Sequence, residues 1–153
     1  MRRTRFPQMV LLSLFALVTL WGFAPTAIQG QSDTSLYARL GRYDAIAAVV
    51  DDFIGRMIDN NQLSRFFTSA STDSKKRIRQ LVVQQLCAAA GGPCLYIGRD
   101  MKASHKGLGI TESDWQVAVS LLGESLDKFK VGPRERADLL AALSGLKGDI
   151  VEK

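Results

Sequence analysis

Residues 101–111 read MKASHKGLGIT and contain His105, the only histidine among the 153 residues of the chain. With a single imidazole, the chain can form neither a two-histidine metal site nor a zinc finger built from cysteine and histidine. One imidazole is sufficient as the axial ligand of a haem iron. A lone histidine is also common as an ordinary surface or core residue, so the surrounding sequence must decide between these readings.

The segment around His105 predicts a short helix. Asp100 can cap this helix, which ends at Lys106, and Gly107 and Gly109 stop it. Its apolar content is poor for a helix that packs on a protein core. We therefore expect one of its faces to contact something other than protein.

The flanking segments predict a purely helical domain. Apolar residues follow the 3.6-residue period over 43–58 and 74–90, after a short helix over 35–40. A capping box over Thr111–Asp114 opens a long helix, and a final helix starts at Pro133 and continues through Ile150. No stretch alternates apolar and polar residues as a strand would. The pattern is typical of a compact helical bundle.

The N-terminus resembles an export signal in its order of features. Arg2, Arg3 and Arg5 precede the apolar run Met9–Ala24, and small residues follow Pro25. The run of about 16 residues is shorter than the roughly 20 that span a bilayer comfortably. We predict residues 1–30 to be a signal peptide cleaved near Ala27–Gln31, or, as the alternative, an uncleaved membrane anchor over residues 9–24. Either reading makes the protein exported, in the periplasm or otherwise outside the cytoplasm, or held at the inner membrane.

The charge of the remaining chain argues against nucleic acid as a partner. The whole chain carries a net charge of +5, but three of its 20 basic residues are the N-terminal arginines, which leaves 17 basic and 15 acidic residues. A net charge of +2 is too weak to predict binding to DNA or RNA.

The two cysteines, Cys87 and Cys94, flank the turn sequence 91–93, Gly-Gly-Pro. Export would place them in an oxidising compartment, where a disulfide persists. A loop this short would stabilise the fold by roughly 2–3 kcal/mol. Two free thiols, with Cys87 buried on a helix, are the alternative.

Several motifs occur in the order found in one known family. They are SLYARLG at 35–41, VVDDF at 49–53, LSRFF at 63–67, and the stretch from Gly91 through Tyr96, GRDMK at 98–102 and His105 to Thr111. Residues 34–153 thereby resemble the group I truncated haemoglobins. The resemblance implies an all-α, shortened globin fold, a two-over-two helical sandwich around a haem b.

The resemblance also implies roles on the side of the haem that carries His105. This histidine would be the proximal ligand and the only protein ligand of the iron. Further haem contacts are implied for Phe67, Tyr96, Met101, Ile110 and Trp115, and hydrogen bonds to the propionates for Arg99 and Lys102. Phe67 can equally be plain core, and both charged side chains can equally be exposed without a partner.

On the distal side, the sequence departs from the family. Phe53 and Ile54 would line the haem pocket, and Ile54 directly follows Phe53 where the family often has a tyrosine that donates a hydrogen bond to bound oxygen. The distal helix presents Ile78, Leu81 and Val82. The loop before this helix is about three residues longer than usual, so a shifted register would instead bring in Gln80, Gln84 or Gln85.

An apolar distal pocket predicts reversible binding of oxygen or another diatomic gas, such as carbon monoxide or nitric oxide, at a five-coordinate iron. One missing donor, worth roughly 1.5–3 kcal/mol, speeds oxygen release by about tenfold to a hundredfold. The alternatives are an enzyme, a nitric oxide dioxygenase or weak peroxidase that works with a reductase, and a haem-free helical scaffold.

Overall fold

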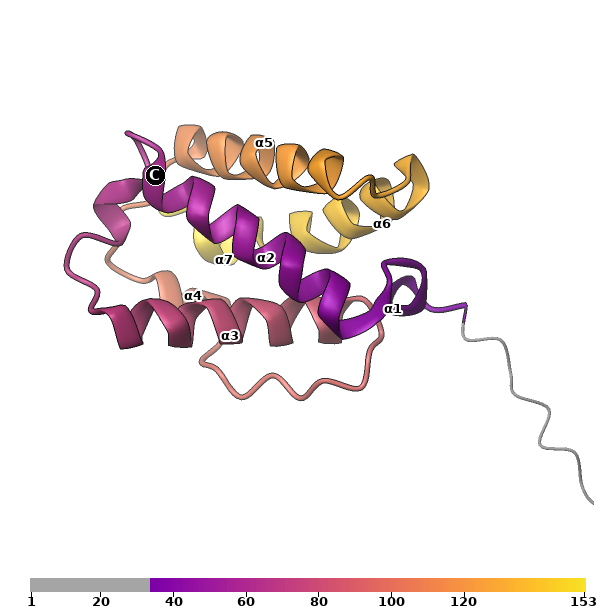
Figure 1. Ribbon diagram of the computed structural model, residues 1–153. Coiled ribbons are helices and arrows are strands. Elements are labelled where there is room, and N and C mark those ends of the chain that lie inside the picture. The colour runs from indigo at the N-terminus through magenta and orange to yellow at the C-terminus, as the bar shows by residue number, and fades with distance from the viewer. Residues whose placement is uncertain (1–33) are drawn as a thin grey trace, which may run out of the picture. The chain divides into compact units, whose positions relative to one another are not determined.

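The computed structural model describes residues 34–153, and the predicted signal or anchor segment lies outside them (Figure 1). The described residues form seven α-helices and one short 3-10 helix, and they contain no strand. The elements are α1 (Leu36–Arg39), α2 (Arg42–Asp59), η1 (Ser64–Phe66), α3 (Thr72–Ala89), α4 (Met101–His105), α5 (Glu112–Lys128), α6 (Pro133–Ser144) and α7 (Lys147–Ile150). This confirms the predicted all-α fold. Among these helices, none has both the length and the apolar character needed to cross a membrane.

The four long helices form two pairs around the core, α2 with α3 and α5 with α6. The helix α2 packs against both α3 and α5, and α6 packs beside α5; in Figure 1, α2 passes between α5 and α3. Fully buried side chains from three of these helices meet, namely Val50, Val83 and Leu126, and Leu139 of α6 joins the same cluster. The short helix α4 makes its main helix contact with α7, so the helix of His105 depends on the C-terminal end of the chain.

Local capping residues set the helix boundaries. The Ser71 side chain caps α3, and Asp100 caps α4 by accepting a hydrogen bond from the Ala103 N–H at 2.6 Å. Thr111 and Asp114 form both hydrogen bonds of a capping box at the start of α5. Each cap satisfies a backbone N–H that lacks a partner within its helix, so these starts are encoded by residues close in sequence.

The predicted single C-terminal helix is wrong, because the structure divides it into α6 and α7. The break lies at Gly145 and Leu146, where the Leu146 N–H donates to the Leu143 carbonyl, a shorter hydrogen-bond spacing than that of an α-helix. Glycine is a poor helix residue, and Gly145 and Gly148 both fall in this stretch. Of the four residues expected to be buried there, Leu139 is buried, whereas Leu143, Leu146 and Ile150 are only partly so.

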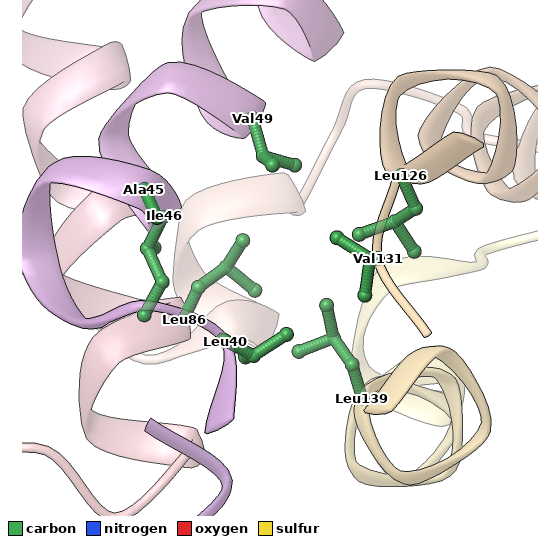
Figure 2. A pocket seen from close by; sticks show the side chains of 8 residues that line it. All are labelled: Leu40, Ala45, Ile46, Val49, Leu86, Leu126, Val131 and Leu139. Atoms are coloured by element: carbon green, nitrogen blue, oxygen red, sulfur yellow. The ribbon is translucent and has the colours of Figure 1, made fainter. Parts of the chain in front are cut away.

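A small apolar pocket marks the junction of the two helix pairs (Figure 2). Its volume is about 10 Å³, and its lining consists of Leu40, Ala45, Ile46, Val49, Leu86, Leu126, Val131 and Leu139. A space this small and apolar is at the limit for one water molecule and offers it no hydrogen bond. The core is therefore closely packed at this end of the domain.

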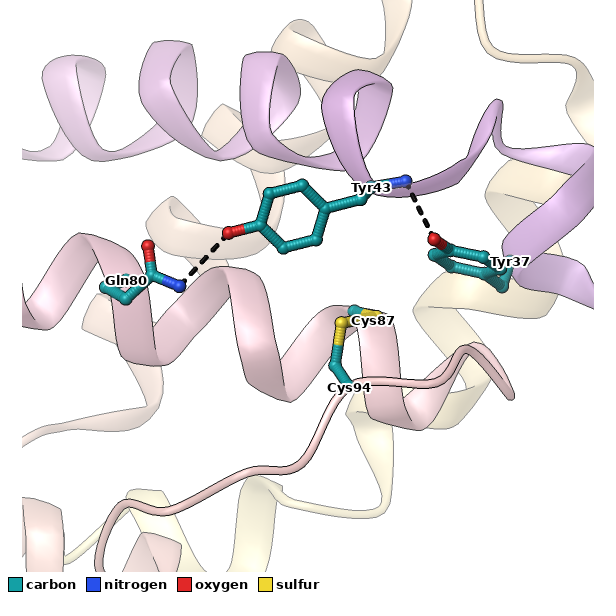
Figure 3. Close-up of a disulfide and its surroundings, with 5 residues drawn as sticks. All are labelled: Tyr37, Tyr43, Gln80, Cys87 and Cys94. Carbon is teal, nitrogen blue, oxygen red and sulfur yellow. Dashed lines mark hydrogen bonds between the residues drawn. A yellow bond between two sulfur atoms is a disulfide. The ribbon is translucent and has the colours of Figure 1, made fainter.

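The two cysteines form a disulfide that joins α3 to the loop leading to α4 (Figure 3). Their Cα atoms lie 5.7 Å apart, and Cys87 is fully buried. Within the enclosed turn, the Gly92 backbone packs on the Tyr37 ring so closely that a Cβ on Gly92 would lie 2.5 Å from it. The Tyr37 hydroxyl accepts a hydrogen bond from the Tyr43 N–H, so the bridge, the turn and the start of α2 are linked.

Replacing Cys94 with serine should lower the free energy of unfolding by about 2–3 kcal/mol, because the short covalent loop no longer restricts the unfolded chain. Urea unfolding of the parent and the variant measures this loss. The parent treated with a reductant should lose the same amount. Equal stability with and without the bridge would contradict the prediction.

Asp52 joins α2 to α5. Its carboxylate accepts hydrogen bonds from Arg56 Nε at 2.6 Å and from the Ser125 hydroxyl at 2.8 Å, and it forms an ion pair with Lys128. Ser125 is fully buried. These donors, Arg56 foremost, hold the pKa of Asp52 well below its usual range.

Asp114 joins α5 to the segment that follows α2, and it is 2% exposed. Burial alone would raise the pKa of Asp114, but hydrogen bonds from Gln62, Thr111 and Arg65 outweigh burial and hold the pKa well below its usual range. The Gln62 amide lies at 2.8 Å and the Arg65 guanidinium at 2.6 Å. Asp114 is therefore ionised in the folded protein at neutral pH.

We expect the fold to lose stability in acid. Asp52 and Asp114 have lower pKa values folded than unfolded, so their contribution is complete above the ordinary aspartate pKa of about 3.9 and declines as the pH falls below it. Urea unfolding at neutral pH and near pH 3 measures the loss. The Asp52→Asn variant should be less stable at neutral pH and lose less on acidification. If Asp52→Asn lost as much unfolding free energy between neutral pH and pH 3 as the parent does, Asp52 would not contribute to the acid sensitivity of the fold.

Candidate functional site

A large cavity lies between the helix pairs and reaches α4. Its volume is about 690 Å³, far more than the pocket in the core. Twelve of the thirteen residues predicted from the sequence line it: Phe53, Ile54, Phe67, Ile78, Leu81, Val82, Tyr96, Arg99, Met101, His105, Ile110 and Trp115. The thirteenth, Lys102, is exposed and does not line it.

His105 stands on the cavity wall as the last residue of α4. Its Nδ1 lies 2.7 Å from the Met101 carbonyl oxygen, one helical turn earlier. A carbonyl oxygen only accepts, so Nδ1 carries the ring proton and donates it. In the neutral ring, Nε2 is then the unprotonated nitrogen, able to bind a metal.

The wall formed by α2 and α3 is almost entirely apolar. Ile54 is 6% exposed, and Ile78, Leu81 and Val82 face the same space from α3. Gln85 is the one glutamine among the described residues that lines the cavity. This wall therefore presents mainly apolar side chains, with Ser74 and Arg77 near the start of α3 and the Gln85 amide near its end as the polar groups.

The other two glutamines considered from the sequence lie outside the lining. Gln80 is engaged between the helices, because its amide donates to the Tyr43 hydroxyl at 3.1 Å (Figure 3). Its side-chain oxygen lies 3.4 Å from the Arg79 guanidinium, which itself pairs with Asp51. Gln84 does not line the cavity either. Of the three alternatives, Gln85 alone is placed to contact a ligand.

Two arginines lie at the cavity from different elements. Arg77 belongs to α3 and Arg99 to the loop before α4, and both are exposed residues that line the cavity. Neither guanidinium has an ion-pair partner among residues 34–153. Two unpaired guanidinium groups at the edge of an apolar cavity can bind a ligand with carboxylate groups through charge-assisted hydrogen bonds.

Arg77 was not predicted from the sequence, because it ends the charged run Lys75-Lys76-Arg77, which is typical of a solvated helix start. Helical spacing could have found it, because Arg77 lies four residues before Leu81 and so shares its face. Ser74, Ser104 and Asp114 are polar lining residues that were also missed. Most of the others are apolar, among them Met57, Leu63, Phe66, Leu108, Ala118, Val119, Leu122, Leu140, Leu143 and Ile150. Periodicity marks such residues as inward-facing but cannot separate a cavity from solid core.

Comparison with known proteins gives one consistent result. The family model for bacterial-like globins matches residues 35–152. Curated relatives include a group 1 truncated hemoglobin GlbN of Mycolicibacterium paratuberculosis, 33% identical over 116 residues that cover 76% of this chain and 83% of the relative. The group 1 truncated hemoglobin LI410 of Chlamydomonas moewusii is 30% identical over 141 residues, covering 84% of this chain and 80% of the relative.

Solved structures match the arrangement of the helices. The Fe(III) form of a truncated hemoglobin from Tetrahymena pyriformis has a TM-score of 0.72 at 20% identity, over 78% of this chain and 99% of that one. A 2/2 hemoglobin from Synechococcus, whose haem is covalently attached, has a TM-score of 0.70 at 22% identity, with the same shares covered. At these identities the likeness shows the fold, and it confirms the two-over-two arrangement.

Proposed function

Because the chain belongs to the bacterial-like globin family, within which its curated relatives are group 1 truncated hemoglobins, we propose that it binds haem in the large cavity with His105 as the axial ligand. The observation that carries the proposal is the His105 imidazole on the cavity wall, with Nδ1 fixed by the Met101 carbonyl. Haem iron would supply the position at which a diatomic gas binds.

The cavity fits this cofactor in size and chemistry. Its volume of about 690 Å³ lies within the roughly 300–1,000 Å³ typical of ligand and cofactor sites. Phe67, Met101 and Trp115 line it with apolar surface suited to a flat ring. Arg77 and Arg99 are available for the two propionates, whereas the exposed Lys102 is a weaker candidate for that role.

The proposed form is haem b, held without a covalent bond. Cys87 and Cys94 are bonded to each other, and the one histidine of the chain would be occupied by the iron. Extraction with acidified organic solvent should therefore remove all the haem. Haem that stays with the protein would require a covalent attachment, as the Synechococcus relative has.

We propose reversible binding of oxygen or another diatomic gas as the function, at a five-coordinate ferrous iron. The apolar side chains of Ile54, Ile78, Leu81 and Val82 support this, because none of these four can coordinate iron. Absorption spectra of the ferric, ferrous and carbonyl forms test the proposal. A six-coordinate, low-spin ferrous spectrum would contradict it, and the absence of a Soret band after haem addition would favour a haem-free scaffold.

A nitric oxide dioxygenase or weak peroxidase is the second candidate, because the Gln85 amide, a possible hydrogen-bond donor, lines the cavity. Such an enzyme needs stabilisation of charge near the bound oxygen and, for turnover, a reductase as partner. Nitric oxide added to the oxygenated protein, followed by a nitrate assay, separates an enzyme from a carrier. Stoichiometric, rapid nitrate formation that recurs when a reductase is supplied would select the enzyme.

We also propose that the protein is exported. The arginine-rich start and the apolar run at residues 9–24 motivate this, and the disulfide supports it, because disulfides persist mainly in oxidising compartments. N-terminal sequencing of the protein from fractionated native cells is the test. A mature chain that starts near residues 27–31 is expected in an extracytoplasmic fraction, whereas an intact N-terminus in the membrane fraction would select the anchor. An intact chain in the cytosolic fraction would rule out export.

A further inference from the structure

The C-terminal residues lie against the segment that follows His105. The Glu152 carboxylate accepts one hydrogen bond from the Gly107 N–H at 2.6 Å and one from the Gly109 N–H at 2.5 Å. The Ile110 carbonyl accepts from the N–H groups of Glu152 and Lys153, at 2.8 Å and 3.3 Å, and the Lys153 carbonyl accepts from the Glu112 N–H at 3.1 Å. Five hydrogen bonds thus join the last two residues of the chain to residues 107–112.

The glycines after His105 allow one carboxylate to bind two backbone N–H groups. Gly107 has φ +83° and Gly109 has φ +65°, a left-handed conformation that glycine adopts at little cost. Backbone N–H groups that converge in this way form a small anion-binding concavity. The Gly-Leu-Gly sequence after His105 is therefore explained by the position of the Glu152 carboxylate.

The helix that carries His105 cannot hold its position alone. The helix α4 has five residues, none of them buried, and an isolated helix of this length is unstable in water. Its main helix neighbour is α7, which leads directly into the C-terminal residues. The Met101 carbonyl orients the imidazole relative to α4, but another contact must orient α4 relative to the domain.

We infer that Glu152 is a positioning residue for His105, because its carboxylate fixes the loop two residues after the histidine and thereby sets the direction in which the imidazole enters the cavity. Glu152 does not line the cavity itself; it holds the backbone of Gly107 and Gly109 by hydrogen bonds, and its charge also interacts with His105 through space. The inference rests on the proposed function for its consequence, which is a fixed geometry of the axial ligand and retention of the haem.

The Glu152→Gln variant of the full chain tests the inference. Its amide keeps one acceptor oxygen but turns an NH2 group toward a backbone N–H, so one of the two bonds is lost. We expect a shifted iron–histidine stretching band in the resonance Raman spectrum of the ferrous protein, and haem transfer to a haem-scavenging protein faster by about tenfold. Asp149→Asn, with the same charge change at an exposed position of α7, is the matched control and should change neither.

Haem-free protein provides a readout that does not depend on the proposed function. The chain has one histidine, so its NMR spectrum contains a single set of imidazole resonances, which Glu152→Gln should shift and Asp149→Asn should leave in place. If the parent binds no haem, the proposed function fails, whereas these resonances still report on Glu152.

Unchanged imidazole resonances and an unchanged stretching band in folded Glu152→Gln would overturn the inference, even if haem loss were faster, because Glu152 would then only stabilise the loop. If Glu152→Gln does not fold, Glu152→Asp replaces it. This variant keeps the charge but shortens the side chain by one methylene. Its imidazole resonances and its iron–histidine stretching band then test the inference in the same way.

Discussion

The His105→Ala variant is expected to lose stable haem binding, with a decrease in affinity of more than about a hundredfold. Loss of a partner that only orients a metal ligand costs 10–100-fold in affinity, and this change removes the ligand itself. The apolar cavity and the two arginines would leave weak, non-coordinated association. The measurement is a haem titration followed at the Soret band, together with the iron–nitrogen signature of the ferrous form.

A neighbouring substitution separates loss of the ligand from damage to α4. Ser104 also lines the cavity, and its hydroxyl donates to the Arg99 carbonyl at 3.2 Å. Ser104→Ala should therefore keep both haem and the axial signature. Added imidazole should restore coordination in His105→Ala, because it can occupy the space the side chain leaves. An unchanged iron–nitrogen signature in His105→Ala without imidazole would refute the assignment of the axial ligand.

The starts and faces of the long helices were predictable because they depend on residues close in sequence. Thr111 and Asp114 satisfy each other's backbone N–H groups at the start of α5, so this boundary can be recognised from residues three positions apart, although Asp114 also bonds to Gln62 and Arg65. His105 was found for a different reason, since it is the one imidazole available. A local capping motif and a residue type that occurs once can both be recognised in a single sequence.

Other features depend on residues distant in sequence. Glu152 binds backbone groups 43 and 45 positions earlier, and no local pattern distinguishes it from an exposed acid near a chain end. The separation of α6 from α7 followed from glycines whose effect depends on the packing of their neighbours. Gln85 and Gln80 lie on the same helix, yet only their surroundings show that Gln85 lines the cavity whereas Gln80 bonds to Tyr43.

The second large effect is expected from Ile54→Tyr, which should slow oxygen dissociation by about tenfold to a hundredfold. Ile54 lines the apolar wall from α2 and is 6% exposed, so a phenol at this position brings an O–H donor into the cavity. Bound oxygen carries partial negative charge, and a hydrogen bond to it is worth roughly 1.5–3 kcal/mol, at about 1.4 kcal/mol per tenfold change in rate. Stopped-flow measurement of oxygen release gives the rate.

Ile54→Phe is the control, because it adds the same ring without the hydroxyl and tests for crowding by the larger side chain. Its oxygen release should stay close to that of the parent, which we expect to be fast. Gln85→Leu tests the one amide on the cavity lining. If oxygen leaves the parent slowly and Gln85→Leu speeds it, whereas Ile54→Tyr changes nothing, then Gln85 already donates to the ligand. The apolar wall would in that case not control oxygen release. The results would then favour a nitric oxide dioxygenase or peroxidase over a protein that binds oxygen reversibly.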